Sequence, residues 1–271
     1  MKKKILFTFF ILIPILFGAD EALAKRARRY DCSGKIARAV NRFHKNRFND
    51  VKTILDQVKM HCSGHSSMDT ALYYLGKANL KTKSPIQASL EFEVLLQDFP
   101  NSPFREEVHF LLGICSYEEA LSYERDQSKT RDAIREFADF IDLFPQSPFA
   151  DSAKQYLIEC QERLVKKEFM NARFYEKVDQ FEAAIVYFRI IIDEFPQSSY
   201  VPECKLSLAR NLIKVSRPKE AAGVLDELLA SDVDGEVKKR AELLLGKIKR
   251  SEGIKPPKTK PDITSEDESS L

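Results

Sequence analysis

The sequence predicts an all-α protein, a solenoid of about five helix–turn–helix repeats. The main observation is a short motif that recurs at Asp98–Phe104, Leu143–Phe149 and Glu194–Tyr200. Each copy contains Phe-Pro, then Asn or Gln, then Ser, and each follows a helical pattern of apolar residues. The alternating apolar and polar pattern of β-strands is absent throughout the sequence.

The residues upstream of each motif proline follow one pattern. An alanine lies twelve residues before the proline and a phenylalanine eight residues before it, and these pairs are Ala88 and Phe92, Ala133 and Phe137, and Ala184 and Phe188. This spacing is typical of the second helix of a tetratricopeptide (TPR) repeat. The small alanine lets two helices approach closely, the phenylalanine fills the space between them, and the proline ends the helix.

Two weaker copies extend the array, Val51 with Leu55 and Ala221 with Leu225, each 37 residues from its neighbour. The predicted repeats cover about residues 33–63, 68–100, 105–145, 148–196 and 201–233, followed by a terminal capping helix. Repeat three carries eight extra residues within the polar stretch from Ser122 to Arg131, and we expect these eight residues to form a loop. Repeat four keeps near-helical apolar spacing without a break, so we expect one long helix from about Pro148 to Glu176.

The N-terminal 24 residues have the pattern of a secretory signal peptide, with Lys2–Lys4, an apolar run and a small-residue cleavage site. We therefore expect an exported chain with its solenoid over residues 25–250; an uncleaved membrane anchor is the alternative. The residues before Cys32 lack the small apolar set that a lipoprotein signal peptidase requires, so we expect no lipid anchor. The Pro-rich and acidic stretch from Ser251 to Leu271 is expected to be disordered.

Charge and motifs argue against several classes of function. The full chain has a formal net charge of +2, which does not favour a nucleic-acid partner. Glycine-rich phosphate loops and catalytic histidine signatures are missing, so we expect neither an enzyme nor a cofactor. His61, Cys62 and His65 could suit zinc or copper, but no fourth ligand lies at a recognisable spacing, and we expect no metal site.

The cysteines divide into two groups. Cys32 precedes the first helix of repeat one and Cys62 follows its second helix, and those two ends meet in an antiparallel pair. Because exported chains are oxidised, we predict a Cys32–Cys62 disulfide; two free thiols are the alternative. Cys115, Cys160 and Cys204 fall within helices and are predicted to be small buried apolar residues.

The three Phe-Pro-x-Ser repeats, the insertion in repeat three and the long helix opening repeat four together resemble one family, the BamD-type assembly factors of outer-membrane β-barrel proteins. The most specific stretch runs from Arg125 to Pro196 and contains Thr130-x-x-Ala133-x-x-x-Phe137 and Glu162-Arg163-Leu164. That family is typically lipid-anchored through an N-terminal cysteine, and this chain departs from it by lacking the corresponding lipobox.

The resemblance implies a periplasmic scaffold at the inner face of the outer membrane, where any membrane contact is indirect. Its later repeats would bind the BamA-like β-barrel insertase, and its earlier repeats would bind unfolded outer-membrane proteins. Tyr187 stands where relatives often place a docking arginine, so we expect Tyr187 and Arg189 to contact the partner. A Tol-Pal-type TPR coordinator of the cell envelope, or another exported TPR scaffold, is the alternative, although the heptads of an N-terminal coiled coil are not evident.

First helices of TPR repeats line the concave face of the superhelix. One-turn spacing around the small residue of each first helix predicts a peptide-binding groove of Tyr73, Lys77, Phe110, Ile114, Tyr117, Phe169, Arg173, Arg210 and Lys214. Aromatic and cationic side chains together suit an extended peptide that carries aromatic residues and a terminal carboxylate. The alternative is that the aromatics belong to the core and the cations to a solvated face.

Overall fold

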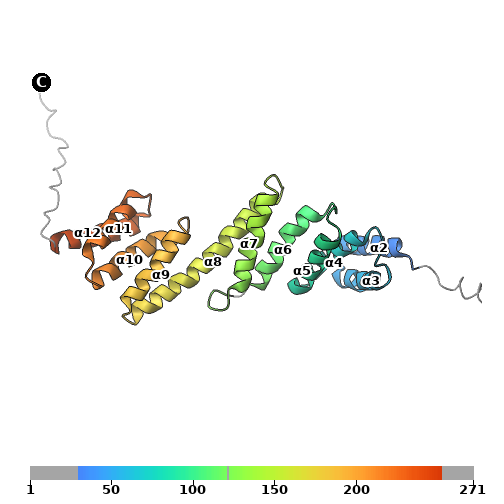
Figure 1. The fold of residues 1–271 in the computed structure, drawn as a ribbon, viewed down its shortest axis with the longest axis horizontal. Helices are drawn as coiled ribbons and strands as arrows, with labels where there is room; N and C mark the ends of the chain where they lie inside the picture. Colours follow the sequence, from blue (N-terminus) through green and yellow to red (C-terminus); the bar gives the residue numbers. More distant parts are fainter. Residues whose placement is uncertain (1–29, 121, 252–271) are drawn as a thin grey trace, which may run out of the picture. The chain divides into compact units, whose positions relative to one another are not determined.

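The computed structural model describes residues 30–120 and 122–251. The signal peptide predicted over residues 1–24 and nearly all of the tail predicted from residue 251 onward lie outside these described residues. Within them the chain forms eleven α-helices and no β-strand (Figure 1). In chain order the helices are α2 (Cys32–His44), α3 (Phe48–His61), α4 (Met68–Lys81), α5 (Pro85–Asp98), α6 (Arg105–Glu119), α7 (Ser128–Leu143), α8 (Ala150–Lys177), α9 (Phe181–Glu194), α10 (Val201–Lys214), α11 (Pro218–Ala230) and α12 (Gly235–Ser251).

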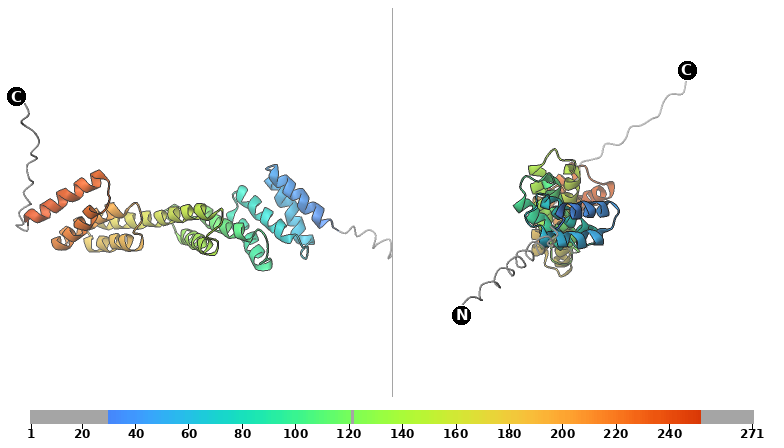
Figure 2. Two further views of the ribbon diagram at one scale, coloured as in Figure 1. Left: turned by 90° about the horizontal axis from the view of Figure 1, so that it is seen from above. Right: turned by 90° about the vertical axis from the view of Figure 1, so that its right-hand side faces the viewer.

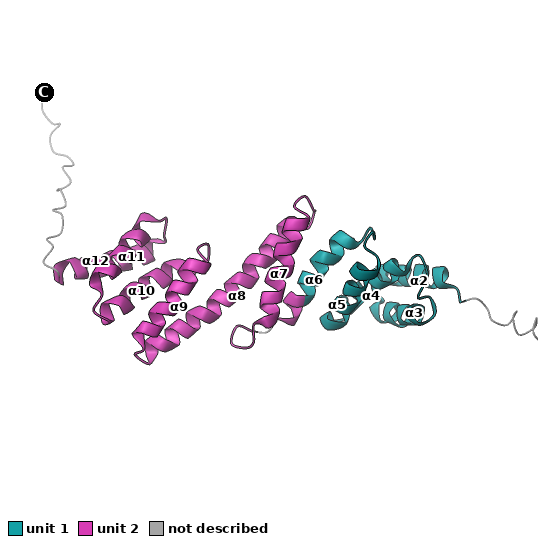
Figure 3. Cartoon of the chain, viewed as in Figure 1, with its two compact units in different colours: residues 1–115 teal, residues 116–271 magenta. Residues whose placement is uncertain are grey.

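The helices belong to two compact units, Met1–Cys115 and Ser116–Leu271, and the boundary between the units falls inside α6 (Figure 3). In unit 1, α2 pairs with α3 and α4 pairs with α5 (Figure 1). In unit 2, α7 and α9 both pack against α8, and α10 pairs with α11 (Figure 1, Figure 2). Short turns make these consecutive helices antiparallel, so the predicted TPR-type fold is confirmed.

Four hairpins close through the same left-handed turn. One residue in each turn has a positive φ of 56° to 62°, and these residues are Asn46, Lys83, Asp179 and Ser216. The next residue's N–H donates to the carbonyl five positions earlier, at 2.8 to 3.0 Å. This bond, typical of the Schellman motif, satisfies a carbonyl at the end of the first helix. The repeated geometry holds the two helices of each hairpin at the same register.

The alanine and phenylalanine positions that define the repeats form the core. Every one of them has no solvent exposure, namely Ala88, Phe92, Ala133, Phe137, Ala184 and Phe188. In repeat two the facing position is Gly76, and a Cβ atom placed there would lie only 2.4 Å from Cε1 of Phe92. The close approach of the two helices therefore requires a small residue on α4.

The serine of each Phe-Pro-x-Ser motif shapes the entry to the next repeat. Ser102, Ser147 and Ser198 each donate their backbone N–H to the carbonyl of the motif phenylalanine at 3.0 Å. Their hydroxyl oxygens accept the N–H two residues later, at 3.1 to 3.3 Å. These bonds satisfy backbone groups of the turn that neither helix can satisfy. They do not cap the next helix, since α8 and α10 begin without a side-chain cap bond.

The insertion in repeat three forms a loop that ends before the polar stretch from Ser122 to Arg131 does. The connection between α6 and α7 covers residues 120–127, and Ser128–Arg131 already form the first turn of α7. The buried amide of Gln127 explains the difference: its nitrogen donates to the carbonyls of Ser122 and Arg125, and its oxygen accepts from the Thr130 hydroxyl at 2.8 Å. These bonds gather the loop around Gln127, so the residues that follow it start a helix.

The long helix predicted to open repeat four is confirmed as α8, with 28 residues. Its first half packs against α7, where Tyr156 stacks on Phe137 at 5.3 Å, and its second half packs against α9, where Phe169 meets Phe188 at 6.0 Å. Among the described helices, none is both long and apolar enough to span a membrane.

The cysteines follow the prediction. Cys32 and Cys62 form a disulfide with their Cα atoms 6.0 Å apart, which ties the start of α2 to the end of α3. Cys115, Cys160 and Cys204 form no disulfide among the described residues and are buried within helices. Since the Cys32 sulfur is in this bond, it cannot also carry a thioether-linked lipid.

Candidate functional site

In unit 1, the predicted groove residues Tyr73 and Lys77 belong to a closed polar cluster. The Tyr73 ring is buried and stacks on Phe104 at 4.1 Å, while its hydroxyl donates to Glu107 at 2.7 Å. Lys77 pairs with the same carboxylate at 2.8 Å. Burial, with the Glu107 hydrogen bond and charge, raises the pKa of Tyr73. Phe110 on α6 is also buried, and Ile114 is partly buried.

In unit 2, three further groove residues lie on α6 and α8. The Tyr117 hydroxyl donates to Glu159 at 2.9 Å, and burial is the main cause of its raised pKa. Phe169 lies against Tyr200 at 5.2 Å and is partly buried. Arg173 is exposed and pairs with Glu176 one turn later on the same helix, at 2.7 Å. The structure therefore does not gather these three side chains around one cavity.

Arg210 and Lys214 are brought together. Both line a cleft of 330 Å³, here called the α10 cleft, whose wall consists of Glu176, Phe181, Arg210, Asn211, Ile213, Lys214 and Leu244. Arg210 forms a salt bridge with Glu203 at 3.1 Å, and Arg240 forms a second salt bridge with the same carboxylate at 2.9 Å. Lys214 lies 5.8 Å from the Phe181 ring and is exposed, so its ammonium remains accessible.

The predicted docking residues lie on α9. Tyr187 stacks on Tyr175 of α8 at 5.2 Å, and a hydrogen bond between the two hydroxyls raises the pKa of Tyr187. Arg189 pairs with Glu220 of α11. Tyr187 therefore contacts α8, whereas Arg189 contacts α11 and has an acidic partner within the chain.

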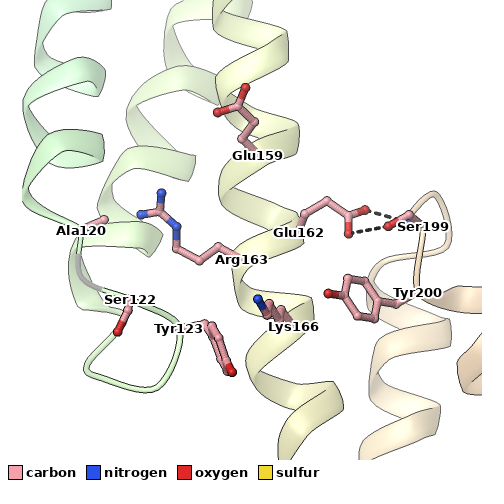
Figure 4. Close-up of a pocket in the computed structure, with 9 residues that line it drawn as sticks. All are labelled: Ala120, Ser122, Tyr123, Glu159, Glu162, Arg163, Lys166, Ser199 and Tyr200. Carbon is pink, nitrogen blue, oxygen red and sulfur yellow. Dashed lines mark hydrogen bonds between the residues drawn. The ribbon is translucent and has the colours of Figure 1, made fainter.

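A second cleft lies beside α8, and the sequence did not single it out. This α8 cleft, of 580 Å³, is lined by Ala120, Ser122, Tyr123, Glu159, Glu162, Arg163, Lys166, Ser199 and Tyr200, all in unit 2 (Figure 4). Its walls are the inserted loop on one side, the middle of α8, and the turn before α10 on the other. The loop exists because of the insertion in repeat three, which is the signal that could have located the cleft.

Glu162 fastens one wall of the α8 cleft. One of its carboxylate oxygens accepts the Ser199 N–H at 2.9 Å, and the other accepts the Ser199 hydroxyl at 3.0 Å (Figure 4). The second oxygen also accepts the Ser198 hydroxyl at 3.1 Å. Three donors on one carboxylate hold the turn before α10 against α8. Glu162 therefore has a structural role, because its hydrogen bonds hold this turn in place.

Two cations of the α8 cleft lie against aromatic rings. The Arg163 guanidinium carbon is 5.1 Å from the Tyr117 ring centroid, and the Lys166 ammonium is 4.3 Å from the Tyr123 ring centroid. In Figure 4 the Lys166 side chain lies between Tyr123 and Tyr200. The Nη1 atom of Arg163 is buried with no hydrogen-bond partner. Within residues 30–120 and 122–251, neither cation forms a salt bridge.

The residues considered for a metal have other contacts. The His65 ring bonds to the Ser33 hydroxyl at 3.0 Å and accepts the Ser67 N–H at 3.1 Å. The His61 ring lies 4.7 Å from Tyr30, and Cys62 is in the disulfide. In the described part of the chain, no group of three or more His, Cys, Asp or Glu side chains is arranged to hold a metal ion.

A family model described as YfiO, outer membrane lipoprotein, matches residues 36–222. The chain belongs to this family. Curated relatives named outer membrane protein assembly factor BamD include those of Caulobacter vibrioides, 27% identical over 123 residues, and Neisseria gonorrhoeae, 28% identical over 167 residues. A putative BamD of Aquifex aeolicus is 25% identical over 195 residues. The resemblance stated from the sequence is therefore confirmed.

These alignments cover parts of each protein. They span 45%, 58% and 68% of this chain, and 40%, 61% and 64% of the Caulobacter, Neisseria and Aquifex relatives. The chain thus matches less than two thirds of each of these relatives' lengths.

Solved TPR proteins are also similar to this chain. One is YrrB, a TPR protein with an unusual peptide-binding site, with 14% identity, a TM-score of 0.39, and 82% of this chain and 97% of that chain covered. Another is a thermophilic TPR protein of Thermus thermophilus, with 15% identity, a TM-score of 0.35, and 79% and 98% covered. These TM-scores are low, so the TPR-type fold is assigned from the helices of this chain and not from these structures.

Proposed function

We propose that this protein is a scaffold in the assembly and insertion of outer-membrane β-barrel proteins, acting at the periplasmic face of the outer membrane and catalysing no reaction. The family match over residues 36–222 is the observation that carries this proposal. Its curated relatives are named outer membrane protein assembly factors. The partners would be a BamA-like insertase and unfolded outer-membrane proteins.

The scaffold would work by binding extended polypeptides along residues 25–250. Two features of unit 2 support this: the α8 and α10 clefts are open and combine aromatic rings with cationic side chains. The helices satisfy most of their own backbone groups, so recognition would depend on side chains that contact aromatic and acidic groups of a peptide. On α9, Tyr187 and Arg189 would contact the insertase.

Only some residues of the predicted groove can be replaced without also disturbing the core, and these are the ones that can test peptide binding. Tyr73 and Lys77 share Glu107, so replacing them would break the core of unit 1 as well as any binding surface. Lys214 is exposed at the α10 cleft and pairs with no acid in the described chain, so its removal changes the cleft and little else. Lys219 on the neighbouring α11 is likewise exposed and lies outside the cleft, which makes it a matched control.

The test measures fluorescence anisotropy of a labelled, aromatic-rich peptide in extended form. The full chain is expected to bind it, Lys214→Ala is expected to weaken binding about threefold because one cation–π and charge contact is lost, and Lys219→Ala is expected to leave it unchanged. Mild affinity purification from the native envelope should also recover an outer-membrane β-barrel protein. Failure of the peptide to bind, together with recovery of Tol or Pal components, would overturn the proposal in favour of an envelope coordinator.

A further inference from the structure

We infer that the α8 cleft is a carboxylate-binding site, in which Arg163 and Lys166 hold a single acidic group of a polypeptide. The inference deepens the proposed polypeptide-binding function and rests on it. The acidic group is either the terminal carboxylate of a chain or an Asp or Glu side chain. Tyr123 and Tyr200, on the two walls, would contact the apolar part of the same segment.

The first argument is that these two cations lie beside an open cleft and face aromatic rings, not acids. Several other cations of unit 2 are paired with acids, for example Lys129 with Glu119 at 3.2 Å and Arg173 with Glu176 at 2.7 Å. Arg163 and Lys166 instead face aromatic rings at 5.1 and 4.3 Å. Neither cation forms a salt bridge in the described chain, although Lys166 is close enough to Glu124 of the loop to act on its charge. These two cations, one turn apart on α8, therefore leave strong hydrogen-bond donors beside an open cleft.

The second argument is the cost of leaving a guanidinium unsatisfied. The Nη1 atom of Arg163 is buried and bonds to nothing in the described chain. Buried polar groups without partners are unfavourable, and a planar guanidinium is suited to bind a carboxylate through two parallel hydrogen bonds. Since Nη1 is buried, a carboxylate that enters the cleft would bond to the Nε and Nη2 atoms, and to Nη1 only after the side chain turns toward the cleft.

The third argument is that the cleft's own acids are engaged elsewhere. Glu162 accepts three hydrogen bonds from the turn before α10, and Glu159 accepts from the Tyr117 hydroxyl at 2.9 Å and from Gln155 at 3.3 Å. Neither is directed to the two cations. The acids still add two negative charges to the cleft, which disfavours a doubly charged phosphate and leaves a singly charged carboxylate as the matching ligand.

The fourth argument is size. A cleft of 580 Å³ accommodates a short segment with one or two side chains and is too small for a folded domain. The loop wall is held in place through Gln127, and the opposite wall through Glu162, so the cleft is formed before the ligand arrives. A preformed site loses less conformational entropy on binding.

The test uses the full chain and four versions of one labelled aromatic peptide. One version has a free C-terminal carboxylate as its only acid, one has an amidated terminus and one internal Glu, one has both acids, and one has neither. The inference expects the acid-bearing peptides to bind at least about fivefold more tightly than the neutral one, and the difference between the first two identifies the source of the carboxylate.

Two variants and one control locate the effect. Lys166 is exposed, so Lys166→Ala is expected to fold normally, and Arg163→Lys keeps the charge but removes the planar fork. Each variant should reduce the preference for acid-bearing peptides about threefold or more. Lys154→Ala, on the same helix but at a position paired with Asp151, should leave the preference unchanged.

Equal binding of neutral and acidic peptides would overturn the inference, as would an acid preference that persists in both Lys166→Ala and Arg163→Lys. In either case the Lys214 experiment still decides the proposed function, because peptide binding that depends on the α10 cleft does not require a carboxylate at Arg163.

Discussion

Gly76→Ala tests the close helix approach that underlies the repeat fold. In an exposed helix, replacing Gly by Ala stabilises by about 1 kcal/mol because Ala has the higher helix propensity. At Gly76 the added Cβ would instead lie 2.4 to 2.8 Å from three carbon atoms of the Phe92 ring, which is fully buried. Ordinary carbon–carbon contacts are about 3.5–4.0 Å, so the ring or helix α4 must shift by about 1 Å in a packed core.

Overpacking of this kind costs about 1–3 kcal/mol, and the contact distance places Gly76→Ala toward the upper end of that range. After subtracting the propensity gain, we expect a net destabilisation of about 1–2 kcal/mol. Urea unfolding followed by circular dichroism measures it, with amide hydrogen exchange to confirm that the loss is in unit 1. The matched control is Gly223→Ala on α11, where an added Cβ meets nothing within 4 Å and should stabilise by about 1 kcal/mol. If Gly76→Ala stabilises the protein as the control does, the reasoning is wrong.

The remaining predictions concern the cysteines. Replacing Cys32 and Cys62 by Ala opens a loop of 30 residues and should destabilise by about 3.7 kcal/mol in the chain-entropy model, seen as faster hydrogen exchange in α2 and α3. Hydrogen exchange in α2 and α3 that is as slow as in the unmodified protein would contradict this prediction. Burial raises the pKa of the Cys204 thiol to about 12, so iodoacetamide at pH 8 should not modify it in the native protein. Denaturation without reductant should make three thiols reactive, those of Cys115, Cys160 and Cys204, and labelling of five would show that the disulfide is absent.

The fold followed from the sequence because its main contacts are local in the repeat. An alanine and a phenylalanine one turn apart face the preceding helix whatever the rest of the chain does, and Ala88 with Phe92 are as buried as predicted. The same locality made the Cys32–Cys62 bond predictable, since the ends of one hairpin meet.

The start of α7 shows where this reasoning stops. Ser128–Arg131 is polar and equally compatible with a loop or a first helical turn, and the structure makes it helical because Gln127 is buried and bonded to the loop. The same kind of reasoning also failed for part of the predicted groove. One-turn spacing cannot distinguish a residue that faces a groove from one that faces the next helix, and Tyr73 and Phe110 are buried in the core.

The sequence by itself determined the helices, the closely packed pairs and the cysteine bond, since each depends on residues within one or two neighbouring helices. Only the tertiary structure decided which cations face aromatic rings and form no salt bridge in the described chain. Arg163 and Lys166 look like ordinary solvated charges in the sequence, and their role follows from a loop inserted about forty residues upstream that encloses them with Tyr123. The groups that surround a charged side chain depend on distant chain segments, and helical periodicity contains no information about those segments.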